Sequence, residues 1–292
     1  MPQTGLNMGR LGNALKRGFA VRRVRSAACA NCDAVMPQYA VDVMGLRFQN
    51  PVGLAAGFDR DGRLVNHLES CGFGFVEIGT VSASRRPGGG SLVAAVKNLA
   101  RVRSAGRGLR VGVNIGSSRD GFGTEALGEH IAAMRALWPF TDYLAINLTS
   151  PRSPARRRLE LPPCAGFLAA LGAERDALTR SSGLRVPLAV KLLLDHEDHA
   201  SQPLVEVLKA AQIAGIIGVS DSVDVLRTAS AAFDPIPIIS VGGIRSAPDV
   251  AARLAAGAML VQIFRAFVGG SPFLPRRIVA GLQAGTELER AG

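Results

Sequence analysis

The 292-residue sequence is poor in the aromatic side chains that hold single-stranded nucleic acids, with only one Trp and two Tyr. Its net charge of +11 comes largely from arginines in residues 10–25, 101–110 and 152–158. A basic protein attracts nucleic acid, anionic lipid or an anionic small molecule. A single-strand groove also needs aromatic rings on which bases stack, and none alternate with these arginines. Nucleic acid is therefore a minor hypothesis.

Cysteine is also scarce. Cys29, Cys32, Cys71 and Cys164 are too few and too scattered for a disulfide framework, which indicates a reducing compartment. Cys29 and Cys32 form a C-x-x-C pair, but no second pair or nearby His completes a set of four zinc ligands. We interpret the pair as reduced thiols and predict no metal site.

Long apolar runs are absent, and so are acids near the N-terminus. Without a run of 18 apolar residues, no segment is expected to span a bilayer. The first 32 residues contain six basic residues and no acid, which is typical of a segment on an anionic membrane, an organellar transit peptide or a solvated tail. Leu11, Leu15 and Phe19 would share a helical face, but Arg22 falls on it too. Peripheral membrane contact and a solvated tail are equal alternatives for the basic extension over residues 1–40.

Short apolar segments alternate with helical patterns from residue 50 onward. The segments are 51–57, 74–81, 110–116, 142–150, 187–194, 215–222, 237–243 and 259–264. Continuously apolar strands joined by helices indicate a parallel sheet that is buried on both faces. Eight such units in about 240 residues fit an α/β fold of the (β/α)8 TIM barrel type better than an open sheet. We predict one barrel domain over residues 41–286 and a tail over 287–292.

Polar residues and glycines follow or end these apolar segments. They include Asp59, Arg60, Thr80, Asn114, Asn147, Ser150, Lys191, Ser220, Asp221, Gly242, Gly243 and Arg265. Catalytic groups of barrel enzymes lie at the C-terminal ends of the strands. One such residue would be explained by turn chemistry, whereas a whole rim of them predicts a functional site.

Two of these positions indicate particular ligands. Gly242 and Gly243 end the seventh segment, and the loops after strands seven and eight form the usual phosphate site of such barrels. A tight turn before the S-x-x-D helix start at Ser246 explains the glycines nearly as well. Lys191 ends an apolar strand, where a buried ammonium needs an anion or a polar ligand such as a flavin. The alternative is that Lys191 extends to solvent at the rim.

Six blocks of the sequence together resemble the FMN-dependent dihydroorotate dehydrogenases, specifically the membrane-associated, quinone-dependent class. The blocks are VMGLRFQNPVGLAAGFDRDG (43–62), GFGFVEIGTV (72–81), VGVNIG (111–116), DYLAINLTSP (142–151), VPLAVK (186–191) and PIISVGGIRSAPDVAARLAAGAMLVQIF (237–264). The resemblance covers nearly the whole predicted barrel in order. It implies oxidation of dihydroorotate to orotate in pyrimidine (UMP) biosynthesis, with FMN as cofactor and a quinone as electron acceptor.

The resemblance also implies roles for individual residues. Ser150, which precedes Pro151 after the fourth strand, matches the serine that removes the C5 proton of dihydroorotate, so it is the predicted general base. A plain turn serine is the alternative. The positions that match flavin contacts are Ala56, Gly57, Thr80, Asn114, Asn147, Lys191, Gly242, Gly243 and the backbone amides of Phe264 and Arg265.

The substrate positions depart from the family pattern. Arg60 replaces a lysine, Arg152 replaces an asparagine, and Ser220 and Asp221 lie where the family has T-N-T. The family's N-x-x-G-F-N-N segment does not occur, and the glycine-rich loop before the seventh strand is missing. Asparagine offers donors and acceptors to a pyrimidine dione, whereas arginine offers only donors. Arg60, Asn147, Arg152, Ser220 and Asp221 are the predicted substrate contacts.

Alternatives to dihydroorotate oxidation follow from these departures. One is a diverged flavin-binding relative with a changed anionic substrate or without dihydroorotate dehydrogenase activity. Another is a basic scaffold that meets anionic lipid or nucleic acid. The expected location is peripheral on the cytoplasmic side of the inner membrane or in the cytoplasm, and a mitochondrial location is a further alternative.

Overall fold

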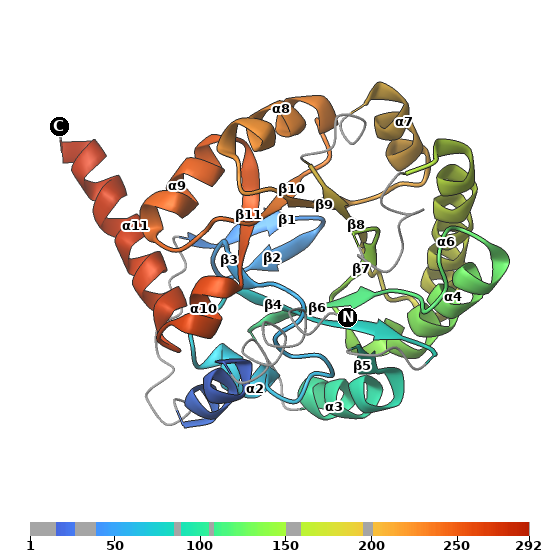
Figure 1. Cartoon of the computed structure of the whole chain (residues 1–292), viewed down its shortest axis with the longest axis horizontal. Coiled ribbons are helices and arrows are strands. Elements are labelled where there is room, and N and C mark those ends of the chain that lie inside the picture. The colour runs from blue at the N-terminus through green and yellow to red at the C-terminus, as the bar shows by residue number, and fades with distance from the viewer. Residues whose placement is uncertain are drawn as a thin grey trace, which may run out of the picture.

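Eight parallel strands form a closed barrel in the computed structural model, which describes residues 16–26, 39–84, 89–104, 108–149, 159–194 and 201–291 (Figure 1). The strands are β3 (Val52–Leu54), β4 (Phe75–Ser82), β6 (Arg110–Ile115), β7 (Tyr143–Asn147), β8 (Leu188–Leu193), β9 (Gly215–Val219), β10 (Ile238–Val241) and β11 (Ala258–Ile263). Pairing of β3 with both β4 and β11 closes the ring. The predicted TIM barrel and its eight strands are confirmed, within a few residues at each strand end.

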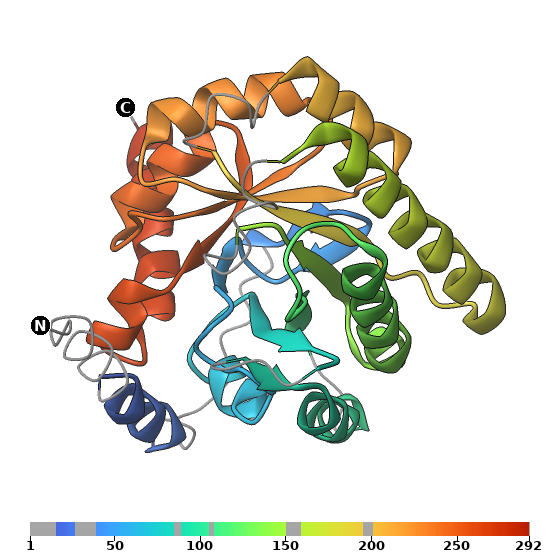
Figure 2. The ribbon, with the colours of Figure 1, turned by 45° about the vertical axis from the view of Figure 1, so that its right-hand side comes forward.

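Helices cover the outside of this ring (Figures 1 and 2). They are α2 (Val65–Glu69), α3 (Leu92–Ser104), α4 (Thr124–Leu137), α6 (Leu161–Ser182), α7 (Gln202–Ala210), α8 (Val223–Phe233), α9 (Ala247–Ala255), α10 (Arg265–Gly269) and α11 (Leu274–Ala291). The expected S-x-x-D start of α9 is a capping box in which Ser246 and Asp249 bind each other's backbone N–H. A short η2 turn (Trp138–Phe140) follows α4, and β5 (Gly90–Ser91) extends the sheet beside β4.

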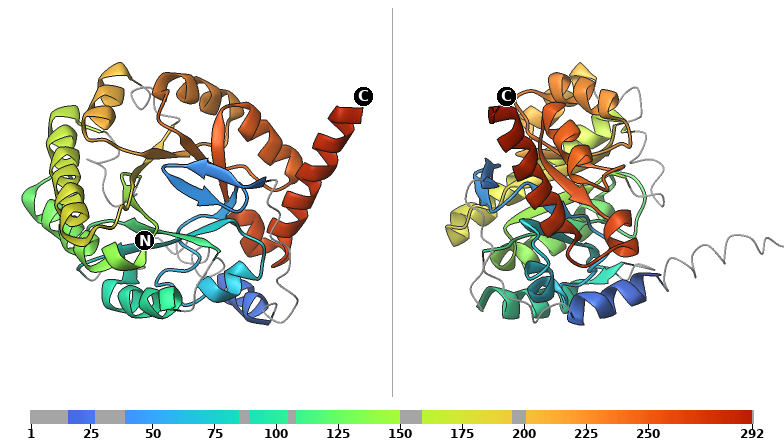
Figure 3. Two further views of the ribbon diagram at one scale, coloured as in Figure 1. Left: turned by 180° about the vertical axis from the view of Figure 1, so that it is seen from behind. Right: turned by 90° about the vertical axis from the view of Figure 1, so that its left-hand side faces the viewer.

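A hairpin that the sequence analysis did not predict closes the N-terminal end of the barrel (Figure 3, left). It consists of β1 (Val41–Val43) and β2 (Leu46–Phe48). Met44 and Gly45 both have positive φ angles, 56° and 73°, as a two-residue hairpin turn requires. Buried side chains of the hairpin pack against inward-facing side chains of the barrel strands. The opposite end, where the strands terminate, is therefore the end at which a ligand site can form.

Glycines make room for large aromatic rings inside the barrel. A Cβ atom on Gly112 would overlap the ring of Tyr143, and one on Gly53 would overlap the ring of Phe75. We expect Gly112→Ala to lower the free energy of unfolding by about 1–3 kcal/mol, because an overpacked core must shift its backbone or side chains. Urea denaturation measures this change.

The matched control for this variant is Gly128→Ala. Gly128 lies on an exposed turn of α4, with no atom within 4 Å of a Cβ placed there. Alanine should stabilise that helix by about 0.5–1 kcal/mol. If Gly112→Ala were as stable as Gly128→Ala, the close packing of Tyr143 would be refuted.

Residues 16–26 form a helix of the predicted N-terminal extension that packs on the barrel wall. Ala20 and Val24 are buried, whereas the Phe19 side chain is 64% exposed. Arg17 Nε donates to the carbonyl oxygen of Phe58 at 3.0 Å, and Arg23 Nη2 donates to that of Val268 at 2.9 Å. The buried face is thus not the one containing Phe19, and Leu11 and Leu15 lie outside the described residues. Within the described ranges, no helix has both the length and the apolar composition needed to cross a membrane.

Candidate functional site

Three side chains from neighbouring strand ends form a hydrogen-bonded group that we call the amide cluster: Thr80 on β4, Asn114 on β6 and Asn147 on β7. Thr80 Oγ1 donates to Asn114 Oδ1 at 2.8 Å. Asn147 Nδ2 donates to Thr80 Oγ1 at 3.1 Å and to Asn114 Oδ1 at 3.0 Å. Both asparagines are buried. The sequence predicted all three residues as site residues, and the parallel strands bring them together because their C-terminal ends meet at one rim.

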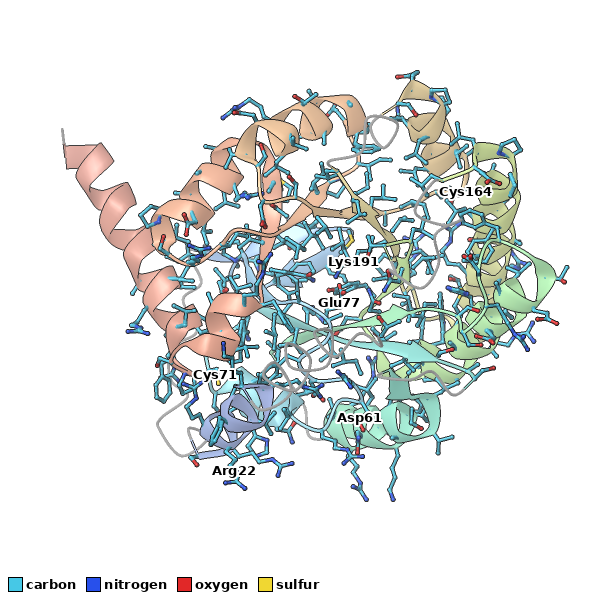
Figure 4. The ribbon with its side chains drawn as sticks, in the orientation of Figure 1. Arg22, Asp61, Cys71, Glu77, Cys164 and Lys191 are labelled. Carbon is cyan, nitrogen blue, oxygen red and sulfur yellow. The ribbon has the colours of Figure 1, made fainter. Side chains whose placement is uncertain are left out.

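Lys191 lies next to the amide cluster and pairs with an acid inside the barrel (Figure 4). Its Nζ atom is 3.4 Å from Oε1 of Glu77 on β4, and both side chains are buried. The sequence predicts an anionic or polar partner for Lys191, and the structure identifies that partner as Glu77. The sequence contains a feature that could have identified Glu77, because it is an acid within the otherwise apolar strand GFVEIGTV. Burial also shows that Lys191 does not extend into solvent at the rim.

Glu77 accepts hydrogen bonds from every polar group that faces it. Besides Lys191, its donors are Asn114 Nδ2 at 3.0 Å, Gln262 Nε2 at 3.0 Å and the Tyr143 hydroxyl at 3.3 Å. Burial and the nearby Glu77 carboxylate raise the pKa of Tyr143 well above its usual value, so the phenol remains a donor. All four neighbours donate to Glu77, and its carboxyl group is the ion-pair partner of the buried Lys191 ammonium.

Glycines from two strand ends line another part of the rim. Gly57, after β3, has a φ of +112°, and a Cβ there would lie 3.3 Å from the Phe264 ring, after β11. Gly242 and Gly243, after β10, have φ angles of +122° and +66°. These conformations favour glycine, and the absent side chains leave backbone exposed between the ends of β3, β10 and β11. Ala56 precedes this region and is partly buried.

A buried arginine fixes the turn that follows β9. Arg253 on α9 is 3% exposed, and its guanidinium donates to the carbonyl oxygens of Ser220 at 2.9 Å and Asp221 at 2.7 Å. The Ser220 hydroxyl is used within the turn, where it accepts from the Ser222 N–H at 3.0 Å. Asp221 Oδ2 lies 3.4 Å from Nη2 of Arg265. Ser220 and Asp221, the predicted substrate contacts, are thus brought to the glycine part of the rim.

Glu129 on α4 joins the loops that follow β4 and β6. It accepts from Ser82 Oγ at 3.1 Å and from the Ser118 N–H and hydroxyl at 2.7 Å each. Burial raises the pKa of Glu129, but the serine hydrogen bonds outweigh burial and bring it to about 2. The carboxylate is ionised at neutral pH and holds both loops at the rim.

The structure describes some of the remaining predicted residues, and others lie outside the described ranges. Arg60 is half-buried in the loop after β3, and burial together with the charge of Arg60 lowers the pKa of Arg17. Ser150 and Arg152 lie outside the described residues, as do Cys29 and Cys32. Cys71 and Cys164 are buried in separate parts of the molecule (Figure 4), and burial raises the pKa of Cys164 to about 12. In the described part of the chain, no group of His, Cys, Asp and Glu side chains could hold a metal ion.

Comparison with known proteins identifies similar sequences and structures. The family model described as "Dihydroorotate dehydrogenase" matches residues 38–91 and 219–285. The protein named "Dihydroorotate dehydrogenase (quinone)" from Leifsonia xyli subsp. xyli is 33% identical over 294 residues, covering 85% of this chain and 86% of its own. The protein of the same name from Shewanella loihica is 32% identical, covering 82% of this chain and 84% of its own.

Solved structures agree on the fold. The ligand-free DHODH of Eimeria tenella superposes with a TM-score of 0.81 at 22% identity, covering 96% of both chains. The same protein in complex with ferulenol gives a TM-score of 0.80, covering 95% of this chain and 92% of the other. The two blocks matched by the family model contain Gly57, Thr80 and the turns after β9, β10 and β11, while Asn114, Asn147 and Lys191 lie between the blocks.

Proposed function

The chain belongs to the family of quinone-dependent dihydroorotate dehydrogenases, and we propose on this basis that it oxidises dihydroorotate to orotate in pyrimidine biosynthesis, with FMN as cofactor and a quinone as acceptor. The observation that carries the proposal is the convergence of the amide cluster and Lys191 at one barrel rim. Four polar side chains from consecutive strands that surround one point are the usual sign of a ligand site in this fold.

The residues at the rim fit a flavin. Thr80, Asn114, Asn147 and Lys191 offer donors and acceptors of the kind that the amide edges of the ring system require. Gly57, Gly242 and Gly243 lie toward the ends of β10 and β11, where barrels of this type bind phosphate, and the Asp221 carboxylate lies over Gly242. Bound in this way, FMN would supply the acceptor for the hydride that leaves C6 of dihydroorotate.

In this proposal the chain's own residues bind and orient the substrate and handle its proton. Asn147 would bind the pyrimidine dione by exchanging hydrogen bonds that its amide makes here to Thr80, Asn114 and Thr149. Ser150 follows β7 three residues later and takes the proton from C5. A serine hydroxyl is a weak base in water, so it must act in a closed site with a route for the proton to leave.

A second candidate function is oxidation of a different anionic substrate at the same rim. It is favoured by the proximity of Arg60 to Arg17, whose pKa is lowered by burial and by the charge of Arg60. A ligand with a carboxylate or phosphate group relieves this repulsion, because guanidinium pairs bidentately with such anions. Arg152, the other arginine that replaces a family residue, would add to this preference.

Contact with a membrane surface would bring the chain to its quinone. We propose that this contact is peripheral and involves the helix of residues 16–26, where exposed Phe19 lies among basic residues. An apolar side chain beside cationic ones is the composition that binds anionic lipid interfaces. Vesicles with and without anionic lipid, sedimented with the full chain, test this part of the proposal.

The test of the function uses the full chain purified in excess FMN. We expect the flavin absorbance to remain with the protein after desalting and dihydroorotate to reduce a soluble quinone analogue. Flavin retention without dihydroorotate turnover would favour the second candidate, and Arg60→Lys should then weaken binding of dicarboxylates. Arg63→Lys is the matched control, because Arg63 is an exposed arginine in the same loop that pairs with Asp61. Loss of all flavin on desalting, with no thermal shift on adding FMN, would refute the proposal.

A further inference from the structure

The connection between β9 and α8 is only three residues long, Ser220–Ser222. Its first and last residues, Ser220 and Ser222, form side-chain hydrogen bonds within the turn and to the start of α8. Ser222 caps α8 with its hydroxyl, and its own N–H is bound by the Ser220 hydroxyl. The middle residue, Asp221, therefore has a fixed place in the turn.

The backbone of Asp221 is held from behind by Arg253. The two short hydrogen bonds from this guanidinium end on the carbonyl oxygens of Ser220 and Asp221, and a third reaches Ser240 Oγ at 3.2 Å. Moving the turn outward would break both of the short hydrogen bonds, and a buried cation is costly when it loses partners. The turn is thus rigid, and only the side chain of Asp221 can change its direction.

The carboxylate of Asp221 points over Gly242, the first of the two glycines after β10. Its Oδ1 atom is 2.7 Å from the place where a Cβ on Gly242 would be, and its Oδ2 atom is 3.4 Å from Arg265 Nη2. An anion thus already lies between the loops that follow β10 and β11. Barrels of this kind use that position for the phosphate group of a ligand.

We propose that Asp221 makes this cofactor site insensitive to the flavin's phosphate group, so that FMN and riboflavin bind with similar affinity. The inference rests on the proposed function, because it assumes that a flavin binds at the rim. A phosphate carries close to two negative charges and would compete with Asp221 for Arg265 and for the backbone of Gly242 and Gly243. The ring and its polar chain meet no such competition at the amide cluster.

The expected effect is moderate, because the Asp221 and Arg265 side chains are 64% and 83% exposed and water screens their charges. Removing one anion from the phosphate position should improve FMN binding by about tenfold. Riboflavin binding should not change. FMN and riboflavin make the same contacts at the ring, so the ratio of their dissociation constants reports on the phosphate group alone.

The experiment titrates the full chain, stripped of bound flavin, with FMN and with riboflavin and follows flavin fluorescence. Wild type is expected to bind both within a few-fold of each other, and Asp221→Asn should bind FMN about tenfold tighter at low salt. Asp224→Asn is the matched control, since Asp224 lies three residues away in an exposed pair with Arg227. It should leave both affinities as they are.

Arg265→Gln completes a double-mutant cycle. It should reduce FMN affinity more in the Asp221→Asn background than in wild type, where Asp221 already engages the guanidinium. The inference would be overturned if the wild type bound FMN much more tightly than riboflavin and if Asp221→Asn left the ratio of the two dissociation constants unchanged. The proposed function would then stand. Failure of both flavins to bind any variant would instead overturn the proposed cofactor and this inference with it.

Discussion

The Glu77→Gln variant is expected to lose about 3–5 kcal/mol of unfolding free energy, because Lys191 would remain buried without a counter-charge. The amide of glutamine would also replace one accepting oxygen with a donor, so one of the groups that donate to Glu77, from Asn114, Tyr143 or Gln262, would lose its acceptor. A buried donor without an acceptor adds its own desolvation cost. Urea denaturation followed by circular dichroism measures the loss.

A second substitution distinguishes the charge from simple loss of packing. Lys191→Met in the Glu77→Gln background removes the unpaired ammonium, so the double variant should be more stable than Glu77→Gln alone. The surface pair of Asp224 and Arg227 provides the control, because Asp224→Asn there should change stability by less than about 1 kcal/mol. A Glu77→Gln variant as stable as the surface variant would show that Lys191 does not depend on Glu77.

The second large effect is expected from Ser150→Ala. If Ser150 takes the C5 proton, the turnover number for dihydroorotate should fall by about 10² to 10⁴, the usual contribution of a general base. The KM should change little, because the proton is transferred only in the transition state. Steady-state reduction of a soluble quinone analogue gives both constants.

The chain between Asn147 and Thr149 is held by side-chain hydrogen bonds. Asn147 Oδ1 accepts from both the N–H and the hydroxyl of Thr149, at 2.9 and 3.0 Å, so the chain turns tightly as it leaves β7. Ser181→Ala, an exposed serine on α6, is the control and should have no effect. Full turnover by Ser150→Ala would mean that this serine is not the general base.

Strands and helices that produce a recognisable pattern among neighbouring residues could be predicted from the sequence. Continuous apolar segments between glycines and polar residues indicated the eight strands, and Thr80, Asn114, Asn147 and Lys191 were found because each is a polar residue near the C-terminal end of such a segment. The hairpin of β1 and β2 was not predicted, since its strands are three residues long and too short to show a period.

Glu77 and Asp221 show where the sequence was not sufficient. Glu77 stands in an apolar strand, but its four donors come from β6, β7, β8 and β11, so only the closed ring reveals its role. The resemblance indicated Asp221 as a substrate contact. The Asp221 side chain is directed toward Gly242 because Arg253, which is 32 residues further along the chain, holds the backbone of Asp221 in place.

Closure of the ring has a consequence for how the chain is made. β3 pairs with β11, and the paired residues, such as Val52 and Val261, come from opposite ends of the barrel sequence. During synthesis the first strand therefore waits for the last to leave the ribosome, and until then the incomplete sheet has two unpaired edges. Such edges are templates for association with other chains. A nascent chain that stops before β11 is thus the form of this protein that most needs a chaperone.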